Sequence, residues 1–184
     1  IYDLGDPASL APQKAEALMC RAYAHFVLAN VFCLPYNPET ADKDMGIPYS
    51  EKPETQVIVK YERGTMAELY EKINADIEAA LPYISDDVYT VPKYHFNKKA
   101  AYAFATRFNL FYVKPDKSNY QKVVEYATQV LGSNPDRALR QMTNYIPLGA
   151  GDVTNAYVQA SENCNLLIIP AYSAAGRIGS GSGP

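Results

Sequence analysis

The chain has 184 residues, of which 48% are apolar and 20% are charged, and its formal net charge at pH 7 is −3. This length and composition are typical of one well-packed globular domain and exclude extensive disorder. Lys and Arg are scattered and no apolar run is long enough to span a bilayer, so neither nucleic-acid binding nor a membrane-spanning helix is predicted.

The first predicted element is a long helix from Ala15 to Phe32. Lys14, Arg21 and His25 fall on one narrow polar stripe, and apolar or small residues cover most of the remaining circumference. This pattern indicates a helix that packs on two sides, in the middle of a helical layer. Because Cys20 follows a large residue inside this helix, we expect a buried packing cysteine and not a lipidation site. The three cysteines include no C-x-x-C pair and predict no disulfide framework.

A proline-broken loop follows the first helix. Pro35 and Pro38 cannot continue a helix, so Tyr36 and Asn37 are expected in an irregular, exposed loop. A proline- and acid-rich connection then ends in a short β-prone run from Gln56 to Tyr61.

The second predicted helix has a clear start and end. Thr65-x-x-Glu68 forms a capping box, in which the two side chains satisfy unpaired amides of the first turn. Apolar residues recur at helical spacing from Met66 to Leu81, and Pro82 ends the helix.

Two further helices are predicted close together. Asn97 caps a core helix that runs to about Val113. Ser118-x-x-Gln121 supplies a second capping box for a fourth helix, which ends at Gly132. The turn between these helices is short, so we expect antiparallel neighbours of about the length of one tetratricopeptide unit.

The last part of the chain gives weaker signals. We expect a fifth helix from Pro135 to about Tyr145, capped by Asn134, and a short helix near Val153 to Ala160. A β-prone run covers Asn165 to Ile169, and the tail GSGSGP packs against nothing. Residues 1–12 and 173–184 are expected to be irregular ends of a single domain, 1–184.

Ordered blocks of this sequence resemble the SusD/RagB family of outer-membrane nutrient-binding lipoproteins. The blocks are AEALMCRAYAHFVLANVF, MGIPY, TMAELYEKINADIEAALP, KAAYAFATRFNLFY and NYQKVVEYATQVL. The resemblance covers roughly Gln13 to Tyr172 and implies an all-α fold of tetratricopeptide-like helical hairpins with long irregular loops. Because members of the family are considerably longer, the chain resembles their N-terminal portion and is expected to be a fragment of a longer protein.

The resemblance also implies a function. It predicts a non-enzymatic, surface-exposed lipoprotein of the outer membrane that captures a glycan and delivers it to a TonB-dependent transporter of the SusC type. The membrane would be reached only through a lipid anchor that this chain lacks. Two alternatives remain: a peptide-binding member of the family, and a generic tetratricopeptide-like interaction scaffold. A third hypothesis, a hydrolase fragment, would need a clustered pair of carboxylates, and the sequence spacing supplies no such pair.

The candidate ligand-binding residues are loop residues, chosen because a phenol ring offers an apolar face to a sugar and a hydroxyl to its polar edge. They are Tyr36, Asn37, Tyr49, Tyr89 and Tyr94.

No catalytic residue, metal site or cofactor is predicted. His25 and His95 are far apart in sequence and are interpreted as surface or hydrogen-bonded histidines. Asp42-x-Asp44-x-Gly46 lacks the later ligands of a calcium loop, so a solvated acidic loop is favoured.

Overall fold

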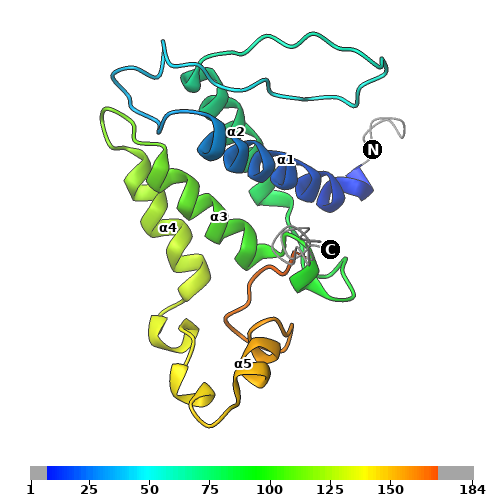
Figure 1. The fold of residues 1–184 in the computed structure, drawn as a ribbon, viewed down its shortest axis with the longest axis vertical. Coiled ribbons are helices and arrows are strands. Elements are labelled where there is room, and N and C mark those ends of the chain that lie inside the picture. Colours follow the sequence, from blue (N-terminus) through cyan, green and yellow to red (C-terminus); the bar gives the residue numbers. More distant parts are fainter. Residues whose placement is uncertain (1–7, 170–184) are drawn as a thin grey trace, which may run out of the picture.

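The computed structural model describes residues 8–169, and within this range the protein consists of helices and loops without a β-strand. The α-helices are α1 (Ala11–Phe32), α2 (Met66–Ala80), α3 (Lys98–Phe111), α4 (Asn119–Leu131) and α5 (Ala150–Tyr157). Figure 1 shows α1 beside α2 and α3 beside α4, with the long α1–α2 connection arching over one end of the molecule. The predicted all-α fold of tetratricopeptide-like helical hairpins with long irregular loops is therefore confirmed. None of the helices in residues 8–169 has the length and apolar character needed to cross a membrane.

The first hairpin is formed by α1 and α2. The capping box predicted at the start of α2 is present, since Glu68 N–H donates to the Thr65 hydroxyl and Thr65 N–H donates to the Glu68 carboxylate. Met19 of α1 and Ile73 and Ile77 of α2 are fully buried between the helices. Each such side chain contributes about 1.5–3 kcal/mol through its removal from water.

Helix α1 departs from its predicted form in two respects. It begins at Ala11 instead of Ala15, preceded by a single 3-10 turn, η2 (Ala8–Leu10), so residues 8–12 are helical. Cys20 is exposed, which overturns the expectation of a buried cysteine, because it is one residue, about 100° of helix rotation, from Met19 on the buried stripe of α1. The predicted irregular ends at 1–7 and 173–184, and the tail GSGSGP, lie outside the described residues.

The second hairpin is formed by α3 and α4. Asn97 caps α3 as predicted, because its side-chain oxygen accepts the Ala100 N–H. The capping box predicted at Ser118 is wrong: its backbone is already helical, and its side chain makes no cap bond. Asn119 is buried instead and donates from its side-chain amide to the carbonyls of Asn109 and Tyr112. These bonds satisfy carbonyls that the end of α3 leaves unpaired.

Aromatic rings join the two hairpins. Phe26 of α1 makes edge-on contacts with Phe104 and Phe108 of α3, with ring centroids 5.7 and 5.9 Å apart. Tyr70 of α2 packs on Phe108 at 5.5 Å. Aromatic pairs at these separations add about 0.5–1.5 kcal/mol each beyond the burial of their area. The core of the molecule therefore lies where α3 meets the α1–α2 hairpin.

The segment after α4 differs most from its predicted form. Gly132 ends α4 as predicted, with a φ of 65°. The continuous helix expected from Pro135 to Tyr145 is wrong, since this range forms two 3-10 helices, η5 (Pro135–Ala138) and η6 (Met142–Tyr145). The chain is extended at Leu139, and this break lets the Arg140 guanidinium bond both the Tyr145 hydroxyl and the Asn165 side chain.

The other predictions for this part were partly right. The short helix expected near Val153 to Ala160 exists as α5, shifted towards the N-terminus. Neither β-prone run forms a strand. Gln56 to Tyr61 lies in the exposed α1–α2 connection. Asn165 to Ile169 is irregular, and its backbone N–H groups donate from Asn165 to the Glu162 carbonyl and from Ile168 to the Lys93 carbonyl.

Candidate ligand-binding site

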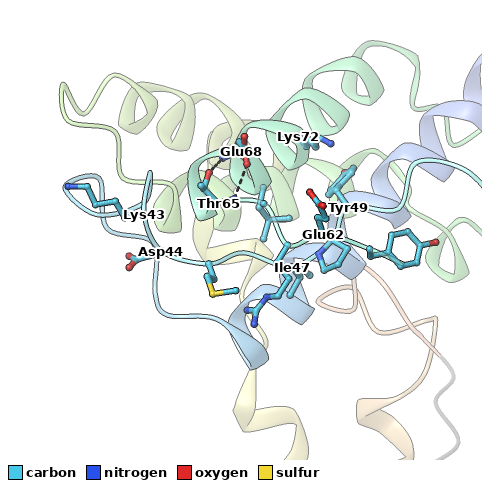
Figure 2. A pocket seen from close by; sticks show the side chains of 14 residues that line it. Lys43, Asp44, Ile47, Tyr49, Glu62, Thr65, Glu68 and Lys72 are labelled. Carbon is cyan, nitrogen blue, oxygen red and sulfur yellow. Dashed lines mark hydrogen bonds between the residues drawn. The ribbon is translucent and has the colours of Figure 1, made fainter. Parts of the chain in front are cut away.

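The α1–α2 connection folds back on the first turns of α2 and encloses a cleft of about 550 Å³. The two arms of the connection are tied by an antiparallel bridge between Met45 and Thr65 and by a bond from Gly46 N–H to the Gly64 carbonyl. Lys43 and Asp44 lie at one end of the cleft, and Tyr49 and Lys72 lie at the other (Figure 2). The lining residues come from 43–49, 61–65 and the first turns of α2.

Gly46 is required where the two arms meet. It is buried, and a Cβ at this position would lie 2.8 Å from the backbone oxygen of Thr65. A contact this close between a side-chain carbon and a backbone atom forces the arms apart. Gly46, the last residue of the Asp42-x-Asp44-x-Gly46 segment, therefore serves the close approach of two chain segments.

Tyr49 is held rigidly at the edge of the cleft. Its hydroxyl donates to Asp76 Oδ2 of α2 at 2.5 Å, and one face of its ring stacks on His25 of α1, with centroids 4.0 Å apart. Burial, followed by the hydrogen bond to Asp76, raises the pKa of Tyr49 well above its ordinary range. The phenol therefore stays protonated and fixed in orientation at physiological pH.

The acceptor of this bond is itself part of an ion pair. Asp76 receives hydrogen bonds from Nε and Nη2 of Arg21, both at 2.6 Å, in the parallel geometry typical of arginine and carboxylate. Arg21 also donates through Nη1 to the carbonyl of Glu51. The polar stripe of α1 therefore faces α2 and the connection, and it anchors residues 49–51.

His25 completes this anchor and is hydrogen-bonded, as the sequence predicted. Its Nδ1 lies 2.8 Å from the Arg21 carbonyl, and its Nε2 lies 3.1 Å from the Ser50 N–H. Because Ser50 donates, Nε2 must be the unprotonated nitrogen, and Nδ1–H must donate to the carbonyl. The geometry thus assigns a neutral imidazole beneath the Tyr49 ring.

The charges around the cleft balance one another. Several of its charged groups already have partners: Arg63 Nε donates to the Gly46 carbonyl, and Lys72 pairs with Glu51 at 3.0 Å. Glu68 is used in the capping box. The cleft offers a rigid ring and polar groups without a dominant charge, which suits a neutral ligand rich in hydroxyl groups.

A second, shallower hollow of about 390 Å³ adjoins the cleft and is enclosed by residues 49–61. Tyr49 and Tyr61 line both hollows. Tyr61 is 46% exposed, and its hydroxyl donates to Glu54. The sequence analysis did not single out Tyr61, because it lies at the end of the short β-prone run from Gln56 to Tyr61. The available signal was a tyrosine in a long polar connection.

The structure does not gather the five predicted ligand residues at one place. Tyr49 lines the cleft, whereas Tyr36 packs on Tyr70 and Tyr112, with centroids 4.7 and 5.1 Å away. The expected exposure of Tyr36 is therefore not observed, because the loop folds its ring back onto the core. Asn37 is exposed and stabilises a turn, its side-chain oxygen accepting the Glu39 N–H.

The remaining predicted tyrosines lie near the start of α3. The Tyr89 ring stacks on His95 with centroids 4.1 Å apart, and His95 Nδ1 contacts the Glu16 carboxylate of α1 at 2.8 Å. Tyr94 belongs to the 3-10 turn η4 (Pro92–Tyr94) and is 52% exposed.

The acidic loop predicted at Asp42 and Asp44 forms a turn, in which the Thr40 hydroxyl donates to Asp44. Within residues 8–169, no three His, Cys, Asp or Glu side chains are grouped so that they could hold a metal ion.

The helical hairpins and the cleft beside them define an all-α protein with a ligand-sized hollow next to its first hairpin. Residues 4–110 match the SusD-like family described as starch-binding and associating with the outer membrane. Because this match covers more than half of the chain, the protein belongs to the SusD-like family.

Two solved structures share this fold. A SusD superfamily protein from Bacteroides thetaiotaomicron VPI-5482 is 27% identical, with a TM-score of 0.59, over 76% of this chain and 28% of that one. A protein from Bacteroides vulgatus ATCC 8482, named as a candidate sugar-binding protein, is 22% identical, with a TM-score of 0.62, over 85% of this chain and 32% of that one. The chain thus spans less than a third of each of these structures. No curated protein matches the sequence significantly.

Proposed function

We propose that this protein is a non-enzymatic glycan-binding component of outer-membrane nutrient uptake, and that an oligosaccharide binds across Tyr49 and Tyr61. The observation that carries the proposal is the fixed Tyr49 ring, held by Asp76 and His25 at the edge of a cleft without a dominant charge. Membership of a family described as starch-binding supports a carbohydrate ligand.

The two adjoining hollows favour an oligosaccharide over a monosaccharide. Because Tyr49 and Tyr61 line both, a ligand that occupies both must pass these rings. Tyrosine provides an apolar face and a polar hydroxyl at small entropic cost, which matches the two kinds of surface on a sugar ring.

The test is calorimetric titration of the protein with neutral oligosaccharides of increasing length, using Tyr61→Ala as the site variant. Tyr61 is chosen because it is exposed, so its loss should leave the fold intact. We expect saturable binding that strengthens with ligand length and weakens about tenfold in Tyr61→Ala, the loss expected for one stacking contact. Tyr120→Ala, which removes an exposed tyrosine from α4, is the matched control and should bind as the unmodified protein does.

Binding of peptides with no response to any oligosaccharide would contradict the proposal and favour the peptide-binding alternative. Equal binding by Tyr61→Ala and the unmodified protein would place the ligand elsewhere.

We further propose delivery of the glycan to a TonB-dependent transporter of the SusC type from a surface-exposed, outer-membrane position. Support comes from the family description, which associates its members with the outer membrane. The expected result is co-purification of this protein with a SusC-type transporter encoded by a neighbouring gene. If membrane extracts contain the transporter but the two proteins do not co-purify, the delivery role is contradicted.

A further inference from the structure

A separate cavity, of about 490 Å³, lies away from the Tyr49 cleft and shares no lining residue with it. It is enclosed by the first turn of α3, the end of α4, η5 and residues 163–166. No sequence motif pointed to it, because its walls come from segments up to 80 residues apart, from Asp86 to Leu166.

The charged side chains that line this cavity are mostly cationic. Lys93, Lys99 and Arg137 supply positive charge, and Asp86 is the acidic residue among the lining residues. Asp86 already accepts the backbone N–H of Lys98 at 2.7 Å through Oδ1. The cavity therefore has a local excess of positive charge, although the chain as a whole carries a net charge of −3.

The three cations are available to a ligand to different degrees. Lys93 Nζ donates one hydrogen bond, to the Glu162 carbonyl at 2.7 Å, which fixes its position and leaves further N–H donors. In the part of the chain that the structure describes, the side chains of Lys99 and Arg137 have no hydrogen-bond or ion-pair partner. Lys99 also lies in the first turn of α3, where the helix dipole adds positive potential.

The rest of the lining is mixed: Asn97, Asn163 and Asn165 are polar, and part of the wall is apolar. Val130 and Leu131 from the end of α4, together with Leu166, provide surface without charge. A cavity lined by cations, amide groups and some apolar surface fits a ligand that carries an anionic group on a ring with hydroxyl groups and C–H faces. A bare inorganic anion would leave the apolar surface unused.

We propose that this cavity binds a saccharide that carries a carboxylate, such as a hexuronate residue. The Arg137 guanidinium can present two parallel N–H groups to a carboxylate, while Lys93 and Lys99 add point charges. The choice of a sugar as the carrier of the carboxylate rests on the glycan-binding function proposed above; the anion site itself rests only on the cavity.

The test is calorimetric titration of the protein with trigalacturonate and with its fully methyl-esterified form, which has the same rings but no charge. We expect trigalacturonate, and not the ester, to bind at this cavity, and any binding of the neutral ester at the Tyr49 cleft to be weakened by Tyr61→Ala instead. Lys99→Gln and Arg137→Gln should each weaken binding about tenfold, the loss expected for one charge-assisted hydrogen bond. Lys98→Gln, the neighbouring exposed lysine outside the cavity, and Arg107→Gln, an exposed arginine of α3, are the controls and should bind normally.

Equal binding of trigalacturonate and its ester, or unchanged binding by Lys99→Gln and Arg137→Gln, would overturn the proposal. Inorganic phosphate that binds as tightly as trigalacturonate would also overturn it, because a general anion site would then be sufficient. Tyr61→Ala should bind trigalacturonate normally. The two proposals can therefore fail separately. Loss of neutral-oligosaccharide binding tests the Tyr49 cleft, and loss of trigalacturonate binding in Lys99→Gln and Arg137→Gln tests this cavity.

Discussion

Arg21 and Asp76 form a two-point ion pair that joins α1 to α2 across 55 residues of sequence, with both N–O distances at 2.6 Å. Their side chains are 23% and 10% exposed, so water screens the pair only weakly. Since Tyr49 donates to the same carboxylate, the pair both closes the first hairpin and positions the ring at the cleft.

Asp76→Ala should lower the free energy of unfolding by about 3 kcal/mol, because it leaves the Arg21 guanidinium poorly hydrated and without its carboxylate. The change should appear as a lower midpoint in urea denaturation. Lys72→Gln, which removes the exposed ion pair to Glu51, is the control and should cost less than about 1 kcal/mol. Equal losses in the two variants would show that the buried pair has no special role.

Alkaline pH should destabilise the protein through its buried tyrosines. Burial raises the pKa of Tyr70 to about 12, and burial with the Asp76 hydrogen bond raises the pKa of Tyr49 further. An unfolded tyrosine titrates near pH 10, so the folded state holds more protons above this pH. Stability is therefore fully present below about pH 10 and falls as pH rises towards about 12.

Thermal denaturation at a series of pH values would measure this fall. Tyr49→Phe and Tyr70→Phe should each make the alkaline slope shallower, because each removes one linked proton. Slopes equal to that of the unmodified protein would show that neither phenol titrates as the structure indicates.

Phe108→Ala should cost about 3–5 kcal/mol, as for other buried aromatic truncations. Phe108 is fully buried, and its ring contacts Phe26, Tyr70 and Tyr112 from both hairpins and the end of α3. Leu110→Ala, at a 53% exposed position of the same helix, should cost under about 1 kcal/mol. A small loss for Phe108→Ala in chemical denaturation would contradict a central position for α3.

Tyr36→Ala should reduce stability by about 2 kcal/mol, because the ring packs between Tyr70 and Tyr112. Binding of a neutral oligosaccharide should be unchanged in calorimetry under conditions where the variant remains folded. Weaker binding without a loss of stability would instead support the interpretation of Tyr36 as an exposed ligand contact.

The features predicted correctly from the sequence depend on near neighbours. The Thr65–Glu68 capping box, the Asn97 cap and the Gly132 terminus each involve residues within one turn of one another, so local spacing was sufficient. Ser118 shows the limit of this reasoning. Its capping motif was present, but buried Asn119 took over the local hydrogen bonding by reaching back to the end of α3.

The candidate site could not be predicted in the same way. The ion pair between Arg21 and Asp76 anchors the Tyr49 ring, and the cleft depends on the backbone bridge between Met45 and Thr65. Neither of these long-range contacts produces a periodic pattern in the sequence. Tyr36 and Tyr49 are both loop tyrosines, and the sequence favours Tyr36 as the ligand contact because prolines flank its loop. Tertiary packing places the Tyr36 ring against the core and the Tyr49 ring at the edge of the cleft.

The most direct test of the central claim is a map of amide chemical shifts by NMR during titration with the best neutral oligosaccharide. Binding across Tyr49 and Tyr61 predicts that the largest changes fall in residues 43–65 and the first turns of α2, with little change around Lys99 and Arg137. Changes centred on any other part of the described chain, with residues 43–65 unaffected, would contradict the account.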